Sequence, residues 1–158
     1  MEKLRLWLEH RGFELEQTRG APDEVELLSR VVTINASAPY QKRVAALIHE
    51  CGHVRIFLRR LRRPGARVCG VSLREDLLGK GRCDHRGRSS RICLLQEEME
   101  AWDSGEQLAK ALGVRYERRG LEKTRTSSLM TYVEHAASRM RTAPAAHRKR
   151  AGRTKRNP

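Results

Sequence analysis

Residues 44–54 read Val-Ala-Ala-Leu-Ile-His-Glu-Cys-Gly-His-Val, a helical pattern that contains two histidines four positions apart. Apolar residues recur every three or four positions over residues 44–61, which is the period of an amphipathic helix. Spacing of four places His49 and His53 on one face of that helix, one turn apart. This face lies opposite Cys51, so we expect a helix that is buried on one side and lines a cleft with its histidines on the other.

His49, Glu50 and His53 form an H-E-x-x-H pattern, in which two imidazoles one turn apart can share a zinc ion. Glu50 stands beside them and can accept a proton from metal-activated water. A catalytic zinc site also needs a third protein ligand and an open position for water. The pattern therefore predicts a metal-dependent hydrolytic centre, and the alternative is a pair of solvent-facing histidines on an ordinary amphipathic helix.

A second helical stretch, from about residue 90 to residue 112, offers the third ligand. Glu98 interrupts an apolar stripe formed by Leu94, Ala101, Gly105, Leu108 and Leu112. Burying a carboxylate is costly unless it meets a positive charge. We therefore expect Glu98 to bind the metal rather than Glu97 or Glu100, with a salt bridge from Glu98 to one of the many arginines as the alternative.

The rest of the sequence predicts a single α+β domain over residues 1–140. A short helix is expected over residues 2–11, with Gly12 as its stop, and two or three short strands are expected among residues 13–16, 25–27 and 31–34. Ser37 suits the N-cap of the long helix, and Pro39 suits its first turn. A third helix is expected from about residue 121 to residue 140, and one strand near residues 67–72.

An oxyanion-stabilising donor is the remaining catalytic requirement, and the third helix offers Tyr132 and His135 by residue type. The alternative for Tyr132 is packing within an apolar stripe of Leu129, Val133 and Ala136.

The net charge is +14, and half of the excess lies in residues 141–158, which hold seven bases and no acid. Without large apolar side chains, this segment is expected to be a disordered basic tail. The tail is a candidate contact for nucleic acid through backbone electrostatics. The seven aromatic residues do not cluster with the bases, so no stacking platform for single strands is indicated.

The N-terminus has no apolar signal region, and the longest clean apolar run spans only residues 44–48, so no membrane span is expected. The four cysteines include no C-x-x-C pair, which favours free thiols in a cytoplasmic protein. Cys69, Cys83, His85 and Cys93 fit no standard zinc spacing, so we interpret them as unpaired rather than as a second metal site.

Residues 47–53, preceded by a strand and a Ser/Pro turn and followed by Glu98-Met99-Glu100-Ala101-Trp102 on a later helix, resemble the ImmA/IrrE-type metallopeptidases of phages and mobile elements. The resemblance covers roughly residues 1–135 and implies a minimal gluzincin with a zincin-like fold. It implies that His49, His53 and Glu98 bind one Zn²⁺ per chain and that Glu50 is the general base in peptide-bond hydrolysis. Trp102 stands where the family often has Asn.

The same resemblance implies a protein or peptide substrate and a cytoplasmic location, in a bacterial host cell if the protein is phage-encoded. A weaker similarity links the chain to SprT-like proteases, which act on DNA-bound proteins, but a third downstream histidine ligand and a C-x-x-C ribbon are missing. The alternative function is therefore a nucleic-acid-associated binding protein with a structural zinc site and the basic tail as its contact. That reading requires a fourth zinc ligand, for which Cys83, His85 and Cys93 are the candidates.

Overall fold

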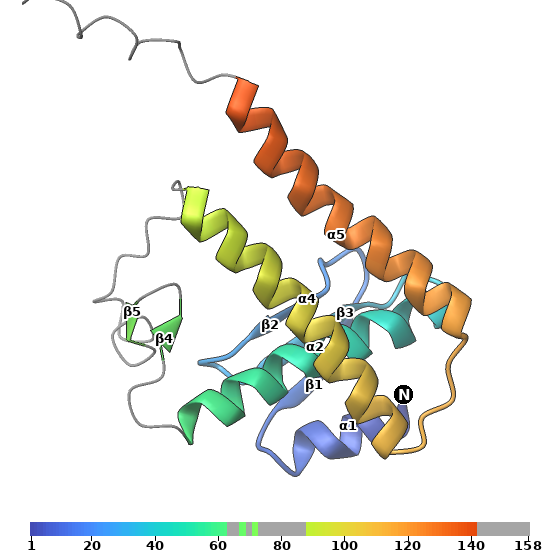
Figure 1. Cartoon of the computed structure of the whole chain (residues 1–158). Helices are drawn as coiled ribbons and strands as arrows, with labels where there is room; N and C mark the ends of the chain where they lie inside the picture. The colour runs from blue at the N-terminus through green and yellow to red at the C-terminus, as the bar shows by residue number, and fades with distance from the viewer. Residues whose placement is uncertain (63–66, 69–70, 73–87, 142–158) are drawn as a thin grey trace, which may run out of the picture.

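A computed structural model describes residues 1–62, 67–68, 71–72 and 88–141, and it confirms the expected α+β class (Figure 1). The elements in chain order are α1 (Glu2–Glu9), β1 (Glu14–Thr18), β2 (Glu24–Glu26), β3 (Val31–Asn35), α2 (Tyr40–Leu61), β4 (Arg67–Val68), β5 (Val71–Ser72), α4 (Arg88–Ala111) and α5 (Arg118–Arg141). Among the described helices, none has the length and apolar character needed to cross a membrane.

A three-stranded sheet, in the order β1-β3-β2, follows the first helix. The central strand β3 pairs in parallel with β1 and antiparallel with β2, so β1 and β2 are the two edges. Val32 and Ile34 of β3 are fully buried and belong to the core that the sheet shares with α1 and α2. The three predicted strands are thus confirmed near their expected positions, and the strand expected near residues 67–72 is instead the short antiparallel pair β4–β5.

Helix α2 is the centre of the molecule and is buried more completely than its periodicity predicts. All residues from 44 to 52 are buried, as are Val54, Ile56 and Phe57. The sheet and α1 contact α2, and α4 and α5 pack on it as well. The expectation of one buried side was therefore wrong, because elements distant in sequence cover the other side of the helix too.

The closest contact between helices brings the backbones of α2 and α4 together. A Cβ placed on Gly52 would lie 1.9 Å from the carbonyl oxygen of Ala101, and one on Gly105 would lie 2.0 Å from that of Ile48. Neither position has room for any side chain. Gly52 on α2 and Gly105 on α4 thus set the distance between the two helices.

Charged side chains join the same two helices beside this contact. Arg59 pairs with Glu100, Arg60 pairs with Glu97, and a guanidinium nitrogen of Arg55 donates to the carbonyl oxygen of Ser104 (2.9 Å). These three arginines of α2 are therefore used within the fold, where they hold α4 in register.

The helix ends follow the expected signals with one exception. Gly12 and Gly113 have φ values of 74° and 61°, the left-handed conformation that stops a helix. The expected N-cap at Ser37 was wrong: α2 begins at Tyr40, Pro39 precedes it, and no side chain caps it. The side-chain oxygen of Asn35 instead accepts the Ser37 backbone N–H (2.9 Å), which keeps this residue in the preceding turn.

Several sequence expectations fall partly or wholly outside the described residues. Cys69, Cys83 and His85 lie there, as do residues 142–158 of the predicted basic tail. Arg141, expected as the first tail residue, is the last residue of α5. Leu94 and Leu61, expected within buried stripes, are exposed because they lie towards the ends of their helices, beyond the common core.

We predict that Gly52→Ala lowers the free energy of unfolding by about 3 kcal/mol, because the new methyl group meets the backbone of α4 and the helices must separate. Equilibrium urea unfolding measures this change. Gly120→Ala is the matched control, because its Cβ would meet only the flexible end of Glu117 (3.1 Å) and should leave stability the same or slightly higher. Equal effects of the two substitutions would contradict the close approach of α2 and α4.

Candidate metal and catalytic site

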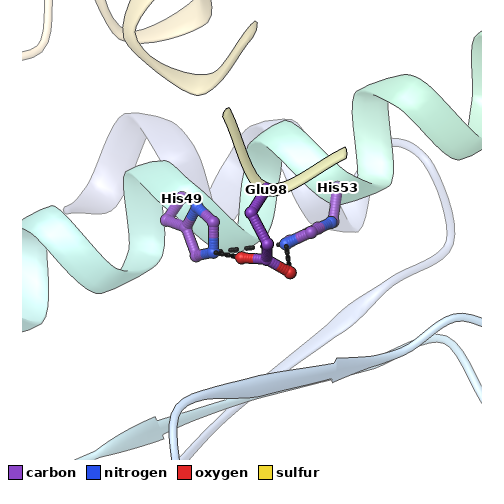
Figure 2. Close-up of side chains that lie close together, drawn as sticks. All are labelled: His49, His53 and Glu98. Carbon is purple, nitrogen blue, oxygen red and sulfur yellow. Dashed lines mark hydrogen bonds and ion pairs between the residues drawn. The ribbon is translucent and has the colours of Figure 1, made fainter. Parts of the chain in front are cut away.

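Three side chains from two helices converge at the centre of the molecule. His49 and His53 project from α2, and Glu98 projects from α4 towards them (Figure 2). Nε2 of His49 lies 3.1 Å from Oε2 of Glu98, Nε2 of His53 lies 3.6 Å from Oε1 of Glu98, and the two Nε2 atoms are 3.2 Å apart. The structure therefore brings together all three of the metal ligands expected from the sequence.

The separations suit a metal ion shared by the three residues. In a tetrahedral zinc site with bonds of about 2.0–2.1 Å, neighbouring donor atoms lie about 3.3 Å apart. The three separations fall on either side of this value. Oε2 of Glu98 is buried without a hydrogen-bond donor within the described residues, and a cation would satisfy it. His49, His53 and Glu98 can accordingly hold a metal ion.

Glu97 and Glu100, the other carboxylates considered for this role, lie elsewhere. Both are paired with arginines of α2, whereas Glu98 is 6% exposed and faces the histidines. The alternative of a salt bridge from Glu98 to an arginine was therefore wrong. The position of Glu98 in the apolar stripe was sufficient to distinguish it from its neighbours.

Burial and the charges within the cluster shift the pKa values of its members in different directions. Burial lowers the pKa of His49, so this ring favours the neutral form that a metal requires. Burial also opposes the charged form of His53, but the Glu98 and Glu50 carboxylates outweigh it and raise its pKa. Burial disfavours ionised Glu98 as well, yet the two imidazoles lower its pKa to about 2. Glu98 is thus ionised and available as a ligand.

Glu50 lies beside the histidines and lines the same cavity. Its side chain is nearly fully buried, and burial raises the pKa of Glu50 to about 7. Nearby carboxylates contribute in the same direction, and the charge of His53 opposes them. A carboxylate with a pKa near neutrality can both accept and release a proton, which is the property expected of a general base.

Tyr132 reaches the site from α5, the third helix of the cavity wall. Burial raises the pKa of Tyr132 to about 12, and the nearby Glu98 carboxylate adds to the effect. Its hydroxyl therefore stays protonated and can donate. Of the apolar stripe considered as the alternative, Leu129 packs against the core, Val133 is exposed and the side chain of Ala136 lies outside the described residues. Tyr132 itself lines the cavity. The side chain of His135 lies outside the described residues.

Trp102 is a site residue to which the sequence patterns assigned no role. Its ring stacks on that of His49, with centroids 4.3 Å apart and planes 21° apart. Trp102 is buried one turn after Glu98, so the four-residue spacing was an available signal for its position. The stacking fixes the orientation of the His49 ring, whose Nδ1 is buried and has no hydrogen-bond partner within the described part of the chain.

The cavity that contains these groups has a volume of about 490 Å³. Its wall is completed by the β2 region, α2 and α5 through Asp23, Glu24, Val25, Leu27, Ala46, Thr124 and Ser128. This is within the size range of sites that bind small molecules or a few residues of a peptide. The arrangement can therefore hold a metal, a proton-transfer group and a hydroxyl donor around one accessible space.

No protein-family model, curated protein or solved structure matches the chain, so the site is interpreted from its own geometry.

We predict that Glu50→Gln stabilises the metal-free protein more at high pH than at low pH. The pKa of Glu50 is about 7 in the folded protein against an ordinary 4.5. Burial of Glu50 therefore does not destabilise the fold below about pH 4.5, where the group is protonated in both states, and it destabilises the fold fully above about pH 7. The gain in unfolding free energy should be on the order of 2 kcal/mol larger at about pH 8 than at about pH 5. Denaturant unfolding at both pH values measures it.

Glu16→Gln, which changes an exposed carboxylate of β1, is the control and should show no such pH dependence. A Glu50→Gln effect of the same size at both pH values would contradict the buried position of this carboxyl group.

Proposed function

We propose that the protein is a zinc-dependent metallopeptidase of the ImmA/IrrE type, with His49, His53 and Glu98 as metal ligands and Glu50 as general base. The observation that carries the proposal is the convergence of three side chains, with separations of 3.1–3.6 Å between their imidazole nitrogens and carboxylate oxygens, on a cavity that Glu50 also lines. Two imidazoles and one carboxylate are the ligand set of several catalytic zinc sites.

The number of ligands supports a catalytic site over a structural one. Structural zinc sites are normally closed by four protein ligands, whereas catalytic sites have three and leave a position open. Within residues 1–62 and 88–141, the group of metal-binding side chains has three members. Cys93 of α4 is a free, half-buried thiol that is not part of this group.

Zinc bound there would polarise a substrate carbonyl and acidify a water molecule. Glu50 would accept the proton of that water and pass it to the leaving amine, a transfer that its pKa of about 7 favours. The protonated hydroxyl of Tyr132 would donate to the developing negative charge on the carbonyl oxygen. Trp102, stacked on His49, would keep this imidazole in the orientation that binding requires.

A polypeptide substrate is supported by the strand beside the cavity. β2 is an edge of the sheet, and Glu24 and Val25 of this strand line the cavity wall. An extended peptide can add to such an edge through backbone hydrogen bonds. A peptide held along β2 would pass the group formed by His49, Glu50 and Glu98.

The alternative proposal is a nucleic-acid-associated binding protein with a structural zinc site, including SprT-like action on DNA-bound proteins. Its support is the net charge of +14 and the basic segment at residues 141–158. It requires a fourth zinc ligand, and two of its three candidates, Cys83 and His85, lie outside the described residues. The buried Glu50 beside the ligands favours the enzyme, because a structural zinc site has no use for a proton acceptor there.

We predict about one zinc ion per chain in protein purified without chelator, measured by elemental analysis. Glu98→Gln should weaken zinc binding by more than about 100-fold, since it replaces a direct ligand and loss of an outer partner alone costs 10–100-fold. Glu97→Gln is the matched control and should retain the metal, because Glu97 pairs with Arg60. Metal-free wild-type protein, or equal losses in the two variants, would contradict the proposed site.

We further predict that Glu50→Gln retains zinc but lowers the rate of peptide-bond cleavage by about 10²-fold or more, because the proton acceptor is lost. Mass spectrometry of a diverse peptide mixture incubated with each protein detects the cleavage products. Cleavage by the variant at the wild-type rate would exclude Glu50 as the general base.

A further inference from the structure

A second cavity, of about 450 Å³, lies beside the catalytic one. It is formed by the first turns of α2, the N-terminal half of α5 and the segment before α5, and its lining includes Lys42, Tyr116, Glu117 and Lys123. Thr124 and Ser128 of α5 line both cavities. The two spaces therefore adjoin along this part of α5, which forms a wall of each.

The two cavities carry charges of opposite sign. Among the described residues, Asp23, Glu24, Glu50 and Glu98 line the catalytic cavity, and no lysine or arginine does. The second cavity has Lys42 and Lys123 against the single acid Glu117. An acidic catalytic cavity is unexpected in a protein with a net charge of +14.

The catalytic cavity would stay negatively charged even with a metal ion bound. A divalent ion would balance Glu50 and Glu98, which leaves Asp23 and Glu24 as the net charge. Asp23 is held at the start of β2, where its side chain accepts the Asn35 N–H (2.7 Å). Within the described residues, neither acid forms an ion pair, and the same is true of Lys42 and Lys123. All four charges are thus available to a ligand.

The shared wall between the charged ends also offers polar groups. Ser128 lies on it, and Ser127 lines the second cavity beside it. The hydroxyls of both serines donate to no acceptor among the described residues, whereas the Thr124 hydroxyl donates to the carbonyl oxygen of Gly120 (2.9 Å). Such hydroxyls can bond to the backbone of an extended peptide.

The length of the path suits a short peptide segment. Lys42 of the second cavity and Glu50 of the catalytic cavity lie eight residues apart on α2, or about 12 Å along the helix axis at 1.5 Å per residue, and this sets the scale of the separation between the two cavities. An extended peptide covers this distance in about four residues, at roughly 3.3 Å each. One polypeptide can therefore place one side chain in each cavity.

We propose that the two cavities form one substrate track for an extended polypeptide, in which Asp23 and Glu24 select a basic side chain and Lys42 and Lys123 select an acidic side chain about four residues away. The occupant is the substrate of the proposed peptidase, so this inference rests on the proposed function. Complementary charges at both ends set which peptides bind and where the chain sits relative to Glu50.

The test measures peptide binding to zinc-loaded Glu50→Gln protein, in which the peptides stay intact. The probes are fluorescein-labelled Ala/Ser peptides with Lys and Glu about four residues apart, in both orders, together with versions in which either charge is replaced by Gln. Fluorescence anisotropy gives the affinities. In the tighter order, each replacement should weaken binding by about three- to tenfold, and high salt should remove the difference.

The track predicts a specific pattern in variants of this protein. Adding Asp23→Asn and Glu24→Gln should abolish the effect of the peptide lysine and retain that of the peptide glutamate, and Lys42→Gln with Lys123→Gln should do the reverse. Glu16→Gln with Arg19→Gln, which removes one exposed charge of each sign near β1, is the control and should change neither effect.

Peptide charge effects that persist in both double variants, or the absence of binding by every probe, would overturn the track. Cleavage of peptides by the wild type without any charge dependence would contradict the track alone. Charge-selective binding without cleavage by the wild type would contradict the proposed peptidase activity and leave the track supported.

Discussion

The direct backbone contact between α2 and α4 is the constraint on which the site depends. Gly52 and Gly105 leave no space between the two helices, and the arginine pairs beside them hold α4 in register. This register places Glu98 opposite His49 and His53 at bonding separations for a shared ion. The same two glycines therefore determine both the helix packing and the geometry of the candidate metal site. A larger residue at either position would displace Glu98 as well as disturb the core.

The buried cluster at this contact holds a carboxylate whose negative charge a bound cation would stabilise. Glu98 loses much of its hydration, and Oε2 of its carboxylate has no hydrogen-bond donor within the described residues. In the metal-free protein the imidazoles supply partial compensation, which lowers the pKa of Glu98 and raises that of His53. For Glu50 the charge of His53 offsets burial only in part, so its pKa rises to about 7. One set of neighbours thus shifts the pKa values of two carboxylates in opposite directions, as the proposed roles of Glu98 as ligand and Glu50 as proton acceptor require.

Local spacing was sufficient to predict part of this site, and tertiary contacts determine the rest. The positions of His49, Glu50 and His53 follow from helix geometry alone, and Glu98 follows from its place in an apolar stripe. Periodicity could not show that α2 is covered on several sides, because the covering helices lie far along the chain. For the same reason, the stacking of Trp102 on His49 depends on how α4 crosses α2. Residue type suggested Tyr132, and the path of α5 decides that it reaches the cavity. The capping role expected for Ser37 failed because the neighbouring Asn35 side chain engages its N–H.

In the proposed site, two histidines and one carboxylate hold a zinc ion with an open position. X-ray absorption at the zinc edge of the zinc-loaded protein is the sharpest test of this arrangement. The expected first shell contains nitrogen and oxygen only, at about 2.0–2.1 Å, with the scattering pattern of two imidazoles. A sulfur shell at about 2.3 Å would contradict it, because a cysteine would then close the site and the zinc would be structural.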